Sequence, residues 1–262
     1  MNGINDTRSG SLIFTGTSNV ELPVTNKASY PPAFREKSRL EYYASLFNSV
    51  EINSSFKKIP MPKTVARWAA SVPDGFRFTF KLWNGITHNK DLVFQAEDVK
   101  NFLTVISASG SRKGCLLVQF PGKLSITALG QVDQLLMHIR NSNPGQEWKV
   151  ALEFRNQSWY HTDVYELLNG YQAAIVYHDM PGSVSTGVEH LGAFIYVRFH
   201  GTEKGYRGTY PDALLKEYAE RMNTWNQQGR EVYVYFNNTL GDAVKNLMTL
   251  NSMLIPGRVH SG

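Results

Sequence analysis

Charged side chains recur at the ends of short apolar segments in this sequence of 262 residues, and their types suit the binding of an anion. Three are carboxylates and three are cations: Glu51, Glu153, Asp179, Lys81, Arg155 and Arg198. Guanidinium and ammonium groups hold phosphate or carboxylate groups through charge-assisted hydrogen bonds. Carboxylates beside such cations either position them or transfer protons. Their balanced charges also allow a self-satisfied ion-pair network that only fills the protein interior.

Other polar and aromatic side chains extend this candidate site. His200 is an acid–base candidate because imidazole transfers protons near neutral pH, and with equal weight it orients Glu153 or Asp179 instead. The catalytic candidates are therefore Glu51, Glu153, Asp179 and His200. Beside the three cations, the ligand-binding candidates are Asn53, His88, Gln119, Trp159 and Asn237. The aromatic rings of Trp83, Trp159 and Tyr206 either stack on a base or sugar or pack beneath a loop.

Strand-like and helix-like segments alternate along the chain. Eight runs of β-branched and aromatic residues predict strands at 12–16, 49–55, 76–82, 114–120, 148–154, 172–179, 193–200 and 231–237. Helical periodicity predicts helices at 37–47, 61–71, 96–109, 126–141, 161–169, 211–228 and 240–253. Such alternation implies parallel strands joined by right-handed crossovers, and eight units are the number at which the sheet closes. The fold class is therefore α/β, a (β/α)8 barrel of the triosephosphate-isomerase type, in a single domain of residues 1–262 with its core at about 12–253.

Local signals refine this prediction. A doubly wound open sheet competes with the barrel, but the GTSN turn at 16–19 lacks the glycine-rich phosphate pattern of that architecture. Residues 180–192 are too few and too rich in Gly and Ser for a full helix, so we expect an irregular barrel with one crossover helix missing or reduced. Ser125 or Thr127 is predicted to cap the fourth helix, and Gly229 to end the helix that Pro211–Asp212 opens.

Side chains of a strand alternate between its two faces, so parity identifies the residues that share a face. In five segments the polar parity is expected to point into the barrel, and the apolar parity to pack under the helices. The polar set is Glu51, Asn53, Arg77, Thr79, Lys81, Glu153, Arg155, Arg198, His200, Tyr233, Tyr235 and Asn237, with Gln119 and Asp179 at the ends of two further strands. Because barrel enzymes form their sites at the C-terminal ends of the strands, we expect a polar pocket at that end, which we call the mouth of the barrel.

Composition restricts the class of protein. A net charge of +5 mildly favours anionic partners, although the scattered Lys and Arg residues form no continuous basic stripe. The single cysteine, Cys115, lies in an apolar run, which predicts a buried, inert thiol. The first ten residues lack a basic and an apolar signal region, and no apolar run approaches the ~20 residues of a membrane span. Together these features predict a cytoplasmic protein without a membrane partner.

Seven segments in register resemble the signature blocks of the YecE-like family, known as domain of unknown function 72. They are VEINSSF (50–56), FKLWNGITH (80–88), LVQFP (117–121), ALEFRNQSW (151–159), YHDMP (177–181), VRFHG (197–201) and YVYFNN (233–238). The resemblance implies an irregular α/β barrel of bacterial and archaeal proteins, related in shape to sugar isomerases and apurinic endonucleases, with no established activity. Carried over by position, it marks as family-motif residues Glu51, Asn53, Lys81, Thr87, His88, Gln119, Glu153, Arg155, Trp159, Asp179, Arg198, His200, Gly201 and Asn237. The glycine–tryptophan pair usual after the first strand is replaced here by GTSNVELPV, and Tyr30 or Phe34 is expected to cover its place.

Other functions compete with anion binding. A glycosidase would use two of the three carboxylates, but Arg155 on the face of Glu153 would depress the pKa that a general acid needs. A metal-dependent isomerase or nuclease would need three or more Glu, Asp or His ligands at a mouth where three cations oppose a divalent ion. A non-enzymatic binding protein is a further alternative. We therefore predict an anionic small molecule or a nucleic acid as the partner, hydrolysis as a candidate reaction, and neither metal nor cofactor.

Overall fold

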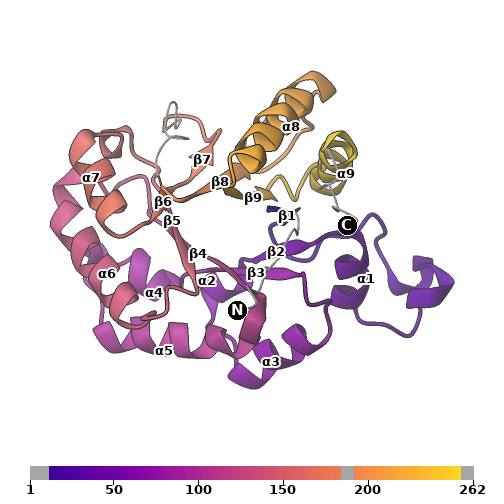
Figure 1. The fold of residues 1–262 in the computed structure, drawn as a ribbon, viewed down its shortest axis with the longest axis horizontal. Helices are drawn as coiled ribbons and strands as arrows, with labels where there is room; N and C mark the ends of the chain where they lie inside the picture. The colour runs from indigo at the N-terminus through magenta and orange to yellow at the C-terminus, as the bar shows by residue number, and fades with distance from the viewer. Residues whose placement is uncertain (1–11, 184–191, 255–262) are drawn as a thin grey trace, which may run out of the picture.

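The computed structural model describes residues 12–183 and 192–254, in which parallel strands form two sheets (Figure 1). One sheet has the order β1–β9–β8–β7, formed by β1 (Ile13–Thr17), β9 (Glu231–Phe236), β8 (Phe194–Phe199) and β7 (Tyr177–His178). The other contains, in order, β2 (Ser49–Ile52), β3 (Arg77–Lys81), β4 (Lys113–Gln119), β5 (Lys149–Glu153) and β6 (Ala174–Ile175). Every pairing between these strands is parallel, as the alternation of strands and helices predicts.

The two sheets adjoin at both edges. β6 and β7 are separated only by Val176, whose N–H donates to the Leu152 carbonyl at 2.8 Å, so together they are the strand predicted at 172–179. At the other edge a single parallel bridge pairs Ser18 with Glu51, and the Asn19 N–H donates to the Glu51 carbonyl at 2.7 Å. The fold is therefore the predicted irregular barrel, and its β1–β2 seam is joined by one bridge in place of a full ladder.

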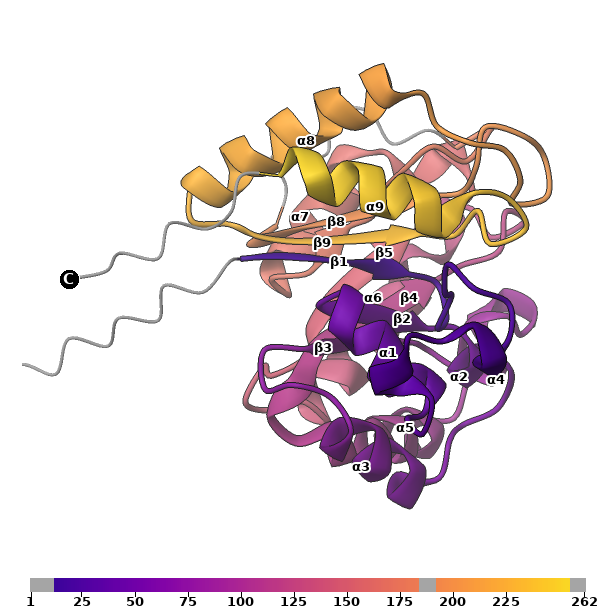
Figure 2. The same cartoon turned by 90° about the vertical axis from the view of Figure 1, so that its right-hand side faces the viewer.

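Helices connect and cover the strands. They are α1 (Arg39–Leu46), α2 (Ser54–Lys57), α3 (Pro62–Ala70), α4 (Asn84–Thr87), α5 (Ala96–Ile106), α6 (Leu129–Asn141), α7 (Thr162–Gly170), α8 (Asp212–Gln227) and α9 (Ala243–Met253). Short 3-10 turns occur at Lys27–Ser29, Pro32–Phe34, Lys90–Leu92, Ser107–Arg112, Ile126–Ala128 and Gln157–Trp159. Figure 2 shows α8 and α9 lying side by side over β8 and β9, and the two make direct contact. Within the described ranges, no helix has the length and apolar composition needed to cross a membrane.

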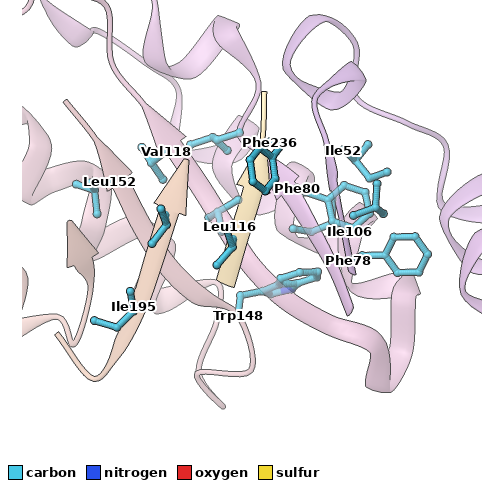
Figure 3. Packing of buried hydrophobic residues seen from close by; sticks show 14 of the residues in the cluster. Ile52, Phe78, Phe80, Ile106, Leu116, Val118, Trp148, Leu152, Ile195 and Phe236 are labelled. Carbon is cyan, nitrogen blue, oxygen red and sulfur yellow. The ribbon is translucent and has the colours of Figure 1, made fainter. Parts of the chain in front are cut away.

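The alternation of side chains along the strands places the core as predicted. Apolar residues on the outward parity of the strands pack under the helices; Figure 3 shows some of the resulting cluster, including Phe80 of β3, Ile106 of α5 and Trp148 just before β5. A second buried cluster comprises Phe14, Cys115, Leu117, Ala151, Ala174, Val176, Phe194, Tyr196, Tyr233 and Tyr235. It lies inside the ring, because the Tyr235 hydroxyl on β9 contacts Ser49 Oγ at 2.6 Å and Thr79 Oγ1 at 2.8 Å across the barrel. Cys115 is wholly buried there, and burial raises the pKa of its thiol well above the ordinary value.

The structure tests two local predictions, which concern the end of α8 and the start of α6; two further ones follow them. Gly229 ends α8 with φ +77°, and the Gly229 and Arg230 N–H groups donate to the Asn226 and Trp225 carbonyls, as a C-terminal glycine motif requires. The predicted cap at Ser125 or Thr127 is wrong, because their hydroxyls contact each other at 2.8 Å and neither caps α6. The reduced crossover expected at 180–192 falls largely on residues 184–191, which lie outside the described residues. Tyr30 and Phe34 both pack against Tyr42 of α1.

Candidate functional site

Arg198 of β8 contacts a carboxylate on β2 and another on β5, inside the C-terminal end of the barrel. Its side chain is wholly buried, and its Nε and Nη2 donate to the two carboxylate oxygens of Glu51 on β2 at 2.9 and 2.7 Å. Its Nη1 donates to Oε2 of Glu153 on β5. The structure therefore brings together these three charged residues, which strand parity placed on one face.

Glu51 is saturated by hydrogen bonds. Besides the guanidinium, Ser18 Oγ donates to Oε1 and the Tyr196 hydroxyl donates to Oε2, each at 2.6 Å. Burial alone would raise the pKa of Glu51, but Arg198 and these hydroxyls hold it below the ordinary value. Both Glu51 and Arg198 are at most 1% exposed, so solvent at the C-terminal end of the barrel barely reaches either side chain. Their geometry fits a buried support better than the catalytic and ligand-binding roles predicted for them.

Arg155 extends this network to the mouth. Its Nε donates to Glu153 Oε1 at 2.8 Å, and its Nη1 donates to the Tyr206 hydroxyl at 3.3 Å. The Arg155 side chain keeps 20% exposure, whereas that of Glu153 has none. Burial would raise the pKa of Glu153, yet Arg198, His200 and Arg155 hold it well below its usual range. Glu153 is therefore an anion that anchors two guanidinium groups, and Arg155 is the one that reaches solvent.

Lys81 lies at the end of β3 and makes no ion pair with a carboxylate in the described part of the chain. Its Nζ lies 4.2 Å from the centre of the Phe56 ring, and among residues 12–183 and 192–254 no carboxylate lies at ion-pair distance from it. The residue is only 8% exposed. Burial, followed by repulsion from Arg198, lowers the pKa of Lys81 to about 7. The ammonium and the neutral amine are thus both populated near neutral pH.

His88 lies beside the Phe56 ring that Lys81 also contacts, and its pKa responds to the cations around it. Its ring meets Phe56 edge-on at 4.9 Å, and its Nδ1 pairs with Thr87 Oγ1 at 2.9 Å. Partial burial lowers the pKa of His88 to about 4, with contributions from the positive charges of Lys81, Arg155, Lys57 and Lys123. His88 is therefore neutral at pH 7, and the four cations add to the effect of burial on its pKa.

His200 lies between two carboxylates. Its Nε2 is 3.5 Å from Glu153 Oε1, and its Nδ1 is 3.4 Å from Asp179 Oδ1, which also accepts the His200 backbone N–H at 2.8 Å. The Tyr210 hydroxyl donates to Asp179 Oδ2 and accepts the Gly201 N–H. Burial would raise the pKa of Asp179, but bonds from His200 and Tyr210 lower it. His200 Nε2 also lies 3.2 Å from Arg198 Nη1, so these contacts place His200 in the network, and both its orienting and its acid–base role stay predictions.

The remaining predicted residues divide into two groups. Asn53 and Asn237 are half-buried at the ends of β2 and β9, and Gln119 is buried with its Nε2 donating to the Phe120 carbonyl at 2.6 Å. Trp159 departs from the ligand-stacking interpretation. It is wholly buried, its ring stacks on Phe154 at 4.5 Å, and its Nε1 donates to the Leu124 carbonyl at 2.7 Å. Its faces and its donor are used in packing, so the alternative of a ring beneath a loop describes it.

Three contributors escaped the sequence reasoning. Tyr196 shares the parity of Arg198, and this signal was sufficient to find it. Ser18 and Tyr210 act from segments outside the strands, where no periodic pattern points to the interior.

The geometry also bears on the competing chemistries. Glu51 and Glu153 are bridged by one guanidinium and are fully buried, so they do not flank an open cleft as glycosidase carboxylates do. In the part of the chain that the structure describes, no three His, Cys, Asp or Glu side chains gather in a metal-binding group.

Comparisons with known proteins place this architecture among relatives. A family model described as "Protein of unknown function DUF72" matches residues 14–260. The UPF0759 protein YunF of Bacillus subtilis (strain 168) is 27% identical over 253 residues, covering 83% of this chain and 86% of that protein. The UPF0759 protein YecE of Escherichia coli (strain K12) is 34% identical over 121 residues, covering 46% of this chain and 43% of that protein.

Solved structures agree with the fold. A DUF72 family protein from Thermotoga maritima has a TM-score of 0.70 and 25% identity, covering 92% of this chain and 98% of that one. Another from Enterococcus faecalis has a TM-score of 0.71 and 22% identity, covering 92% and 95%. A xylose isomerase-like TIM barrel fused to a 4-hydroxyphenylpyruvate dioxygenase has a TM-score of 0.53 and 14% identity, covering 95% of this chain and 46% of the fusion protein. The last two are each below 25% identical to this chain, and their similarity therefore supports only the barrel fold.

Proposed function

The chain belongs to the DUF72 family of proteins of unknown function, and on that premise we propose that the mouth of its barrel binds a small anionic ligand through Arg155 and Lys81. The observation that carries this proposal is the charge arrangement beneath the mouth. Two carboxylates, Glu51 and Glu153, are balanced by two guanidinium groups, Arg198 and Arg155. The third carboxylate, Asp179, is engaged by the His200 N–H and the Tyr210 hydroxyl, whereas Lys81 makes no ion pair with a carboxylate among the described residues.

The two cations differ in what they offer an anion. Arg155 uses Nε for Glu153 and one terminal nitrogen for Tyr206, and its side chain is 20% exposed, so further N–H groups remain to face a ligand. Lys81 offers an ammonium without a carboxylate partner among the described residues. Both cations also act on His88, because Lys81 and Arg155 add to the effect of burial in lowering its pKa.

A phosphorylated or carboxylated small molecule is favoured over a nucleic acid. The positive charges gather at the mouth, and the overall excess of five is spread over scattered residues. A nucleic acid would instead need a row of phosphate contacts and would show affinity that falls steeply with salt. We also propose the cytoplasm as the compartment, since the one cysteine is buried and cannot form an intramolecular disulfide.

Isothermal titration with sulfate and with ribose 5-phosphate tests the proposal, with ribose as the uncharged control. Arg155→Gln should weaken binding of both anions by roughly tenfold or more, since a charged hydrogen bond contributes about 1.5–3 kcal/mol. Arg140→Gln is the matched control, because Arg140 stacks on Tyr171 and lines a pocket with Lys149 and Phe194 at the opposite end of the barrel. Equal affinity in wild type and Arg155→Gln, or no binding of any anion, would contradict the proposal.

A further inference from the structure

Lys81 differs from an anion-holding lysine in one respect: burial and the neighbouring Arg198 and Arg155 disfavour its charge more than Glu153 and Glu51 favour it. The residue is 8% exposed, and its Nζ lies over the face of the Phe56 ring, in a cation–π position. The charged and titratable groups that act on it are Arg198, Arg155, Glu51, Glu153 and His88. The two carboxylates are already engaged by the arginines, and the arginines repel an ammonium.

We propose that the Lys81 amine is a nucleophile that forms a Schiff base with the carbonyl carbon of a ligand bound at the mouth. The inference rests on the proposed function, and it narrows the ligand class to aldehydes or ketones that also carry a carboxylate or phosphate. In this division of roles Arg155 holds the anionic group, and the carbonyl group meets Lys81. The partial positive charge around the site also favours the oxygen as it gains negative charge during attack.

The chemistry balances without an oxidant or reductant. The neutral amine donates its electron pair to the carbonyl carbon, a C–N bond forms, and the C=O π electrons move to oxygen. The oxygen takes a proton from water, and the positively charged nitrogen gives a proton to the hydroxide that remains, which yields a neutral carbinolamine and restores the water. The carbinolamine then loses its hydroxyl together with an amine proton as water, which leaves a C=N bond. Addition of one water molecule reverses the sequence and releases the ligand.

The protonation state agrees with this geometry. An ordinary lysine with a pKa near ~10.4 is neutral in roughly one molecule in a thousand at pH 7.5. Lys81, whose pKa is lowered to about 7, is mostly neutral at that pH. A nucleophilic lysine in an enzyme is activated in the same way, by desolvation and by neighbouring cations.

Lys57 provides an internal comparison. Its Nζ approaches the same Phe56 ring at 5.3 Å, but the residue is exposed. The two lysines thus share an aromatic neighbour and differ in burial and in the arginines beside them.

Reductive trapping tests the proposal. Wild type, Lys57→Arg and Lys81→Arg are incubated at pH 7.5 with sodium cyanoborohydride and either glyoxylate, an anionic aldehyde, or glycolaldehyde, a neutral one. Peptide mapping by mass spectrometry then gives the labelling rate of every lysine. Lys81 should be labelled at least tenfold faster than Lys57 in wild type, the fast adduct should persist in Lys57→Arg, and it should be lost in Lys81→Arg.

Comparison of Lys81 with Lys57 within wild type decides the question even if Lys81→Arg does not fold. Labelling of Lys81 no faster than Lys57 by either aldehyde overturns the proposal. Sulfate binding, measured without aldehyde, separates the two ideas. Sulfate binding with an unreactive Lys81 refutes the Schiff base alone. Fast labelling by glycolaldehyde without sulfate binding supports the nucleophile and refutes the anion site.

Discussion

Replacing Arg198 by methionine leaves two carboxylates buried without the guanidinium that both contact in the wild type. Glu153 keeps its bond from Arg155, whereas Glu51 keeps only the hydroxyls of Ser18 and Tyr196 among the described residues. Removing one partner of a buried ion pair costs about 3–5 kcal/mol, because the remaining charge stays desolvated. Because the free energy of unfolding of a typical domain is only about 5–15 kcal/mol, Arg198→Met should lose a large share of that free energy.

Urea unfolding followed by circular dichroism measures the loss. With a denaturant slope of about 3 kcal/mol per molar, a loss of about 3–5 kcal/mol moves the urea midpoint down by roughly 1–1.7 M. Adding Glu51→Gln to Arg198→Met should recover part of the stability, because a neutral amide replaces the uncompensated charge. Arg155→Met, whose side chain is partly exposed and contacts only one carboxylate, should cost less than Arg198→Met.

The same experiment has a signed pH dependence. In the wild type the pKa of Glu51 lies below its ordinary value, so the carboxylate stabilises the fold above the unfolded-state pKa near ~4.3 and loses that effect as pH falls through its folded-state pKa. Without Arg198, burial raises the pKa of Glu51 above the unfolded-state value, and ionisation then opposes folding as pH rises. The difference in unfolding free energy between wild type and Arg198→Met should therefore be larger at pH 8 than at pH 4.5. A difference below about 1 kcal/mol that is constant with pH would refute the buried network.

Three other predictions concern the mouth and its support. Sulfate affinity should fall as pH rises from 6 to 8.5, because the free Lys81 ammonium is lost through a pKa of about 7; titration calorimetry should show a weaker dependence in Lys81→Met, and an equal dependence would count against Lys81. Trp159→Ala should cost about 3–5 kcal/mol in urea unfolding while leaving sulfate affinity intact, and a selective loss of affinity would return Trp159 to the ligand site. Gly201→Ala should destabilise by about 1–3 kcal/mol, because φ is +111° and the new Cβ would lie 2.2 Å from the Arg207 carbonyl oxygen; a thermal melt unchanged from wild type would contradict this strain.

The fold and the inward-facing residues were predictable because both follow from short-range periodicity. Glu51, Lys81 and Arg198 occupy the inward parity of their strands, and a period of two leaves little freedom in where they point. The break of the predicted strand at Val176 was not predictable, since its backbone bonds to Leu152 of a strand more than twenty residues away. The predicted N-cap of α6 was wrong for a different, local reason. The Ser125 hydroxyl pairs with the Thr127 hydroxyl, and neither caps the helix.

The face of a strand on which a residue lies shows neither how exposed its side chain is nor which side chains it contacts. Arg155 and Arg198 are indistinguishable in sequence as cations near strand ends, yet one keeps 20% side-chain exposure and the other none. The burial of Trp159 depends on Phe154 and on Leu124, a residue from another loop. The polar residues at the C-terminal ends of the strands were therefore predictable, whereas tertiary packing determines which of them are buried and which reach solvent.

A crystal structure of the protein with selenate, located by its anomalous scattering, tests the central claim most directly. Selenate should lie within hydrogen-bonding distance of the Arg155 guanidinium and the Lys81 ammonium, above an Arg198 that still contacts Glu51 and Glu153. A mouth filled by the protein's own side chains, or selenate bound to Arg198 with its two carboxylate contacts broken, would contradict the account.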